Sequence, residues 1–284
     1  RDLARPVGEA QRLCLVTGRH ASMARLHPSV KGVYGAQPTG GNIVSFNLDA
    51  FCSHGKAQGG NAPVSEEAAF AYTTALNYLL GKDSTQRMQV GDASTIFWAS
   101  KACDFEQQWG DFFGQPPKDD PDRNTRAVEA LFKAVQTGAY QQNPDTTRFY
   151  VLGLAPNAGR LAVRFWISST VGEMASLVQK HFVDTRVAHG PRDPDVLSLF
   201  RLLVSTAVQG KAENIPPHLG GEVMRSILGG LPYPEMLLQA TIRRVRAERE
   251  VSYPRAALIK ACINRRTRYQ DPTIQEELKM ASMR

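Results

Sequence analysis

The sequence predicts an α+β fold, in which a mixed N-terminal part with short antiparallel strands and helices is followed by an all-α C-terminal part. Three observations predict it: a glycine-rich start over residues 1–64, a hairpin pattern around residue 157, and helical periodicity from residue 170 onward. We therefore expect an α+β region over residues 1–169, with glycine-rich loops and an antiparallel hairpin, and a helical region over residues 170–284.

The first 64 residues combine glycines with short polar side chains, which is typical of loops and short strands. Within them, Ile43–Phe46 predicts a short strand. A helix follows, because Ser65 suits the N-cap position and Glu66 and Glu67 suit the positive end of the helix dipole. Its apolar residues keep helical spacing up to Gly81: Ala68, Tyr72, Ala75, Leu76, Leu79 and Leu80.

The middle of the chain holds the clearest strand pattern. Residues 149–154 and 160–166 flank a run of turn-forming residues, which predicts an antiparallel hairpin. Alternation in the second arm predicts one apolar face, made of Leu161, Val163 and Phe165, and an opposite face that carries two arginines.

Helices account for most of the remaining chain. Thr170 and Glu173 have the spacing of a capping box at the start of the first one. The other expected elements are a strand at Thr95–Trp98 and helices near residues 125–136, 194–208, 220–228, 233–249, 255–264 and 274–282.

Composition excludes several classes of protein. With 42% hydrophobic and 21% charged residues, the 284-residue chain is neither disordered nor a coiled coil. No apolar run approaches the ~20 residues of a membrane-spanning helix, so we expect no membrane partner. The four cysteines share no short spacing, which favours a reducing, cytoplasmic setting over a disulfide framework.

Positive charge is concentrated near the C-terminus. The net charge of the whole chain is +7, and residues 241–270, with nine basic and two acidic residues, carry the same net charge. Lys and Arg bind nucleic acids by neutralising phosphates, so a polyanionic partner is one interpretation. The alternative is an arginine-rich helix that faces solvent or packs on an acidic protein.

The sequence contains no recognisable catalytic or metal-binding motif, so we expect neither enzymatic activity nor a metal or other cofactor. Cys14, His20 and His27 match no zinc spacing, and the nucleophile-elbow and phosphate-loop motifs are both absent. Asp104 and Glu106 lack the second set of carboxylates that a two-metal nuclease needs. A Mg²⁺-dependent nuclease at the acidic loop 119–122 remains an unfavoured alternative.

A candidate binding surface lies in the loop Ser53–Asn61, with the sequence SHGKAQGGN. Its glycines allow backbone N–H groups to approach a phosphate closely, and Lys56 adds a positive charge. Gln58 and Asn61 carry donor and acceptor atoms that can read a base edge. The alternative is a tight, self-bonded loop in which Asn61 acts as a cap for the following helix.

Several stretches, in order, resemble the large subunit of the type I-C CRISPR effector complex (Cascade), the Csd1-type family. The resemblance covers about residues 13–264. The stretches that carry it are CLVTG (14–18), LHPSVKGV (26–33), GAQ (35–37), VSFN (44–47), AF (50–51), HGKAQGGNAPVS (54–65), TALNYLL (74–80), FWA (97–99), LGLAPN (152–157), RFW (164–166) and YPRAALIK (253–260).

The resemblance implies a non-catalytic subunit of a crRNA-guided surveillance complex in the prokaryotic cytoplasm. Such a subunit recognises the protospacer-adjacent motif in double-stranded target DNA, supports duplex opening and helps recruit a helicase-nuclease. Its other partners are the crRNA-bearing backbone subunits. Relative to that family, we expect the chain to be a piece that lacks an N-terminal region and a C-terminal region similar to a small subunit. A structural subunit that contacts only protein and crRNA is the rival interpretation.

The expected DNA contacts follow from the loop and from the charge. Lys56 is assigned to phosphate, and Gln58 and Asn61 to base edges. Ser53 and His54 in the same loop are further candidates; at position 54 the family more often has an aromatic residue. The remaining candidates are Gln37, Asn42 and Asn47, and on the basic surface Arg243, Arg244, Arg246 and Lys260.

Overall fold

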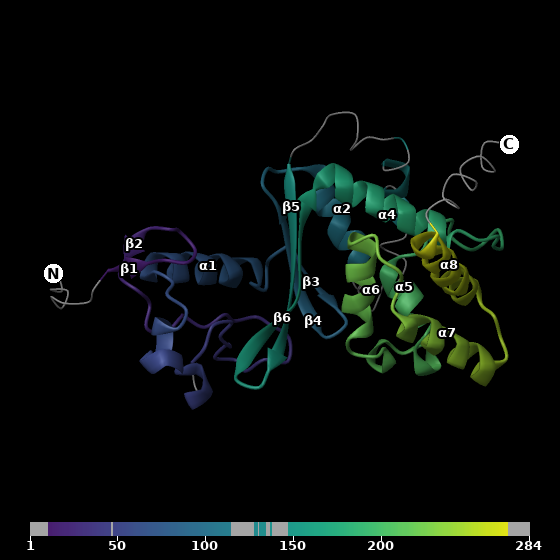
Figure 1. Ribbon diagram of the computed structural model, residues 1–284. Helices are drawn as coiled ribbons and strands as arrows, with labels where there is room; N and C mark the ends of the chain where they lie inside the picture. The colour runs from purple at the N-terminus through teal and green to yellow at the C-terminus, as the bar shows by residue number, and fades with distance from the viewer. Residues whose placement is uncertain are drawn as a thin grey trace. The chain divides into compact units, whose positions relative to one another are not determined.

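The computed structural model describes residues 11–46, 48–114, 128–129, 131–134, 137 and 147–271. These residues form two compact units (Figure 1). The N-terminal unit contains the chain up to Ser84 together with Leu154–Val163, and the C-terminal unit contains Thr85–Gly153 and the chain from Arg164 onward. A single hairpin therefore contributes its tip to one unit and its base to the other.

The N-terminal unit is mostly loop around one helix. Strands β1 (Arg12–Leu13) and β2 (His20–Ala21) pair antiparallel, and helix α1 spans Glu66–Leu79. The Ser65 hydroxyl accepts a hydrogen bond from the N–H of Ala68, which confirms the predicted N-cap. Three 3-10 turns lie before the helix, at Asp49–Phe51, Ser53–Gly55 and Gln58–Gly60.

The strand predicted at Ile43–Phe46 is wrong, because these residues form bends and irregular backbone. The β-bridges of this region involve the two residues just before it, Gly41 and Asn42. Gly41 forms an isolated bridge with Val30, and Asn42 forms one with Arg160 at the hairpin tip. An apolar run therefore did not produce a strand, since the neighbouring chain pairs with the residues that precede it.

The C-terminal unit is built on a four-stranded sheet with the order β3-β4-β5-β6. The strands are β3 (Arg87–Val90), β4 (Ala93–Ala99), β5 (Arg148–Asn157) and β6 (Arg160–Thr170). The predicted strand at 95–98 and the predicted hairpin are confirmed, and both hairpin arms are longer than expected. Val163 is 49% exposed, so the apolar face predicted for the second arm is wrong at this position.

Helices cover one face of this sheet (Figure 1). Helix α2 (Asp104–Phe113) connects to β4, and α4 (Val171–Thr185) begins directly after β6 with the predicted capping box between Thr170 and Glu173. The others are α5 (Leu199–Val204), α6 (Leu219–Leu228), α7 (Glu235–Glu248) and α8 (Tyr253–Gln270), with 3-10 turns at Val208–Gly210 and Ala212–Asn214.

These helices agree with the sequence except at their ends. The helix expected near 194–208 is limited to α5, and the one expected near 255–264 begins earlier and continues to Gln270. Residues 128–129 and 131–134 of the expected helix 125–136 are helical, while the helix expected at 274–282 lies outside the described residues. The division predicted between 169 and 170 coincides with the change from β6 to α4; as a domain boundary it stays a prediction.

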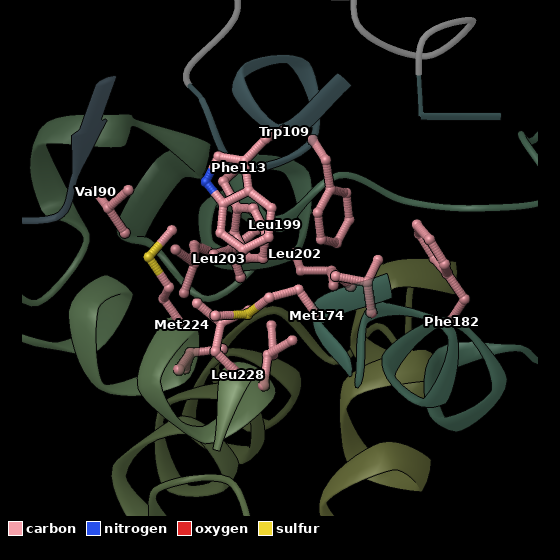
Figure 2. Packing of buried hydrophobic residues seen from close by; sticks show 14 of the residues in the cluster. Val90, Trp109, Phe113, Met174, Phe182, Leu199, Leu202, Leu203, Met224 and Leu228 are labelled. Atoms are coloured by element: carbon pink, nitrogen blue, oxygen red, sulfur yellow. The ribbon is translucent and has the colours of Figure 1, made fainter. Parts of the chain in front are cut away.

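The core of the C-terminal unit combines aromatic side chains with leucines and methionines (Figure 2). Trp109 on α2 is fully buried, with its ring centroid 4.5 Å from that of Phe113 and 4.9 Å from that of Phe149. Gly153 lies on the same face of β5, and a Cβ there would be 2.5 Å from the ring of Phe165. Glycine at 153 therefore lets the Phe165 ring approach the backbone of the neighbouring strand closely.

Candidate nucleic-acid interface

The loop Ser53–Asn61 is held against the chain at residues 24–25. The N–H of Gly59 donates to the carbonyl of Arg25 at 3.2 Å, and a Cβ on Gly59 would be only 2.1 Å from the carbonyl oxygen of Ala24. Only glycine allows this close approach of two backbones. Left-handed backbone at His54 and Gln58 turns the loop on either side of Lys56.

Lys56 lies at the centre of the loop, and its side chain is exposed. Its carbonyl accepts a hydrogen bond of 2.7 Å from the Nδ2 of Asn61, and the guanidinium of Arg12 donates to the carbonyl of Gly60 at 3.3 Å. These bonds shape the backbone and leave the Lys56 ammonium group facing solvent. The loop thus combines both sequence interpretations: Asn61 bonds within the loop, as in the self-bonded alternative, and Lys56 faces outward. The role of Asn61 as a helix cap is wrong, because Ser65 is the N-cap of α1.

The other predicted contacts in the N-terminal unit differ in exposure. Gln37 and His54 are exposed and Gln58 is half-buried, while the side chain of Ser53 and the whole of Asn47 lie outside the described residues.

The side chain of Asn42 is hydrogen-bonded within the N-terminal unit. Its Nδ2 donates to the carbonyl of His27 at 2.6 Å, and its Oδ1 accepts from the Ser29 hydroxyl at 3.4 Å. Its role as a DNA contact stays a prediction that these bonds do not favour.

Most cations of the basic segment 241–270 are engaged within the fold. Five of its nine cations have carboxylate partners: Arg244 and Arg255 pair with Glu248, Arg265 and Arg268 with Asp184, and Arg266 with Glu235. Lys260 donates to the carbonyl of Arg186. Arg243 and Arg246 on α7 remain exposed, and neither has an ion pair within the described parts of the chain. The segment is therefore a set of structural ion pairs with a small basic surface on α7.

A row of aromatic side chains lies on the face of the sheet opposite the core. Trp98 on β4, Tyr150 on β5 and Trp166 on β6 have ring centroids 5.3 to 5.8 Å apart, and Trp166 is 52% exposed. By strand alternation, Arg148 on β5 and Arg164 on β6 share this face; Arg148 donates to the hydroxyl of Ser168 and Arg164 pairs with Asp92. The sequence analysis missed this row, although alternation in each strand places these three residues on one face.

Buried polar groups of the N-terminal unit serve its structure. Cys14 is fully buried, and hydrogen bonds from Thr17 and Ser65 lower the pKa of its thiol to about 6. His27 contacts the Tyr72 hydroxyl at 2.7 Å, and burial lowers the pKa of its imidazole. The described residues contain no group of three or more His, Cys, Asp or Glu side chains arranged to bind a metal ion. None of their helices combines the length and apolarity needed to cross a bilayer.

Comparison with known families assigns the chain to one of them. The family model described as CRISPR-associated protein (Cas_Csd1) matches residues 3–282, nearly the whole sequence. The chain belongs to the CRISPR-associated Csd1 family. A search of curated proteins finds no match. The resemblance to the Csd1-type family is thereby confirmed, and the protein is a CRISPR-associated subunit of the Cascade type.

Proposed function

We propose that this Csd1-family chain is the non-catalytic subunit of a crRNA-guided complex that reads the protospacer-adjacent motif in duplex DNA, supports duplex opening and helps recruit the helicase-nuclease. The observation that carries the proposal is the exposed Lys56 on a loop whose backbone is held by its neighbours. In guided complexes of another class, base pairing reads the target and protein reads only the short motif, and the same division of labour is proposed here by analogy.

Rigidity of the loop supports motif reading. The contacts of Gly59 and Asn61 hold the backbone before any ligand arrives, so binding costs little further ordering. Lys56 is then placed to neutralise one phosphate, which adds affinity without sequence preference. The half-buried Gln58 has a carboxamide with one acceptor and one donor group, which suits a base edge.

The aromatic row supports duplex opening. Once a duplex is separated, unpaired bases expose their faces, and stacking on an aromatic side chain stabilises them by roughly 1 to 3 kcal/mol per base. Trp166 offers such a surface with about half of its side chain exposed. Trp166→Ala should weaken binding to single-stranded DNA by this amount, whereas Trp166→Phe, which keeps a ring, should lose much less.

The test of motif reading uses Cascade assembled with the full chain and its guide RNA. Lys56→Ala should weaken binding to every motif and reduce the salt dependence, the slope of log K against log salt, by about one unit. Gln58→Ala should instead relax preference among motifs, at roughly 1 to 3 kcal/mol. Asn61→Ala also removes the bond to the Lys56 carbonyl, so it should relax this preference and weaken binding to every motif. Lys82→Ala is the matched control, because Lys82 is an exposed lysine of the same unit outside the loop. Equal effects of Lys56→Ala and Lys82→Ala would contradict the assignment.

A structural subunit that contacts only protein and crRNA is the second candidate. The internal pairing of the basic segment favours it, since these arginines are engaged within the chain. A gel shift of the purified chain with duplex DNA at low salt distinguishes the two, because a purely structural subunit gives no shift. The acidic loop 119–122 lies outside the described residues; incubation of the chain with labelled DNA and Mg²⁺ should give no cleavage if the subunit is non-catalytic.

A further inference from the structure

A small basic cavity lies in the C-terminal unit between α4, the loop after α6, and α8. Its volume is about 110 Å³, and it is lined by Lys180, Gly230, Arg265, Arg268 and Tyr269. Three of these five residues are cations that come from two helices far apart in the sequence. The fold therefore brings separate positive charges to one site.

The guanidinium of Arg265 is buried at this site and only partly satisfied. Its side chain is 4% exposed, its Nε lies 3.7 Å from a carboxylate oxygen of Asp184, and its Nη2 donates to the carbonyl of Ile227 at 3.4 Å. The Nη1 atom has no hydrogen-bond partner among the described residues. The Tyr233 ring also lies against this guanidinium, with its centroid 4.7 Å from the guanidinium carbon, but offers Nη1 no oxygen acceptor. A buried N–H group without an acceptor is costly, so a ligand that accepts a hydrogen bond from Nη1 would be favoured.

The local charge is positive even after internal pairing. Asp184 is the carboxylate that pairs with both Arg265 and Arg268. Lys180 is exposed and has no ion pair within the parts of the chain that the structure describes. Two of the three cations thus share one carboxylate and the third is unpaired, which leaves an excess of positive charge around the cavity.

We propose that this cavity binds a phosphate group. Its volume has room for several water molecules or for one tetrahedral oxyanion. Guanidinium groups match phosphate oxygens geometrically, and Lys180 supplies a point charge at the open side. This site is independent of the proposed motif reading, which rests on the N-terminal unit. The phosphate comes either from a nucleic acid or from solution, and the experiment separates the two sources.

The experiment titrates inorganic phosphate into the full-length chain, at constant ionic strength held with chloride, by calorimetry. Saturable binding of one phosphate per chain is expected. Lys180→Gln should weaken it roughly two- to fivefold, as for an exposed charge pair. Arg268→Gln should weaken it more, and Arg268→Lys should restore part of the loss. Lys211→Gln, at an exposed lysine of the same unit outside the cavity, is the control and should leave phosphate affinity unchanged.

Oligonucleotide competitors then identify the source. If a 5′-phosphorylated single strand competes better than the unphosphorylated strand, the bound group is a terminal phosphate. If both strands compete equally, it is a phosphate of the nucleic-acid backbone. No competition by either strand assigns free phosphate. The proposal is overturned if phosphate binding does not saturate, or if Lys180→Gln and Lys211→Gln bind phosphate equally. Lys180 is exposed, so Lys180→Gln tests the site without removing a buried ion pair.

Discussion

Each of the two units is stabilised by a different kind of packing. In the C-terminal unit, large aromatic side chains on the sheet and the helices are fully buried, among them Trp109, Phe105 and Phe149. A core cluster of the N-terminal unit contains only small residues: Cys14, Ala24, Val64, Ala68 and Ala69. Its loops rely on backbone hydrogen bonds and close backbone contacts instead. Packing of large rings therefore dominates the C-terminal unit, whereas the N-terminal unit combines buried aliphatic side chains such as Leu80 and Val30 with close backbone contacts.

The largest expected effect is on the aromatic core. Trp109→Ala removes a fully buried ring that contacts Phe97, Phe105, Phe113 and Phe149, so it should lower the free energy of unfolding by about 3 to 5 kcal/mol. Chemical denaturation followed by circular dichroism measures this loss. Hydrogen exchange should show loss of protection in the C-terminal unit. A loss below about 1 kcal/mol would contradict the importance assigned to this core.

Acid should also destabilise the C-terminal unit. Burial, with a contribution from the nearby Arg265, lowers the pKa of His181 to about 3, and its Nδ1 contacts the Tyr233 hydroxyl at 2.6 Å. Below pH 6.5 the unfolded chain binds a proton at His181 and the folded chain does not, so stability falls as pH falls. Between pH 7 and pH 4.5 this costs about 2 to 3 kcal/mol.

Denaturation curves across that pH range measure the loss. His181→Gln should reduce the number of protons taken up on unfolding by about one, and so reduce the slope of the unfolding free energy against pH. His20→Gln, at an exposed histidine of the N-terminal unit, is the control and should keep the wild-type pH slope. An unchanged slope in His181→Gln would show that other groups cause the acid sensitivity.

Local patterns in the sequence predicted much of this structure. The capping box of Thr170 and Glu173 and the N-cap at Ser65 were found because each motif spans only a few residues. Helix α2 was not predicted, although Phe105, Trp109 and Phe112 have helical spacing and the first turn holds two acidic residues.

Long-range contacts explain what the sequence could not predict. Arg268 pairs with Asp184, 84 residues away, so the charge of segment 241–270 gave no indication that its arginines are engaged within the fold. The aromatic row depends on the register of three strands, and Trp98 and Tyr150 are separated by a long connection. In the candidate loop, the sequence left open whether the polar side chains face outward or bond within the loop, and only the folded backbone shows that Asn61 bonds to the carbonyl of Lys56.

In the N-terminal unit, backbone geometry should decide the outcome. Gly59→Ala would place a Cβ 2.1 Å from the carbonyl oxygen of Ala24, so the loop must move away, at a cost of about 1 to 3 kcal/mol. Amide hydrogen exchange in residues 53–61 should increase, while exchange in the C-terminal unit stays the same. Gly159→Ala is the matched control, because its Cβ would have no atom within 4 Å. Equal exchange in both variants would refute the role assigned to the close backbone contact.

The smallest expected effect is a change in stability of opposite sign at two alanines of the same hairpin. Ala158, in the hairpin turn, has a φ of +54°, which is unfavourable for any residue with a Cβ. Ala158→Gly relieves this strain but gives the unfolded chain more freedom, so a net stabilisation of about 0.5 kcal/mol is expected. Ala162→Gly, in the extended strand β6, gains nothing and should lose about 0.5 to 1 kcal/mol. Thermal unfolding of both variants measures the two signs, and destabilisation by both would show that the turn is not strained at Ala158.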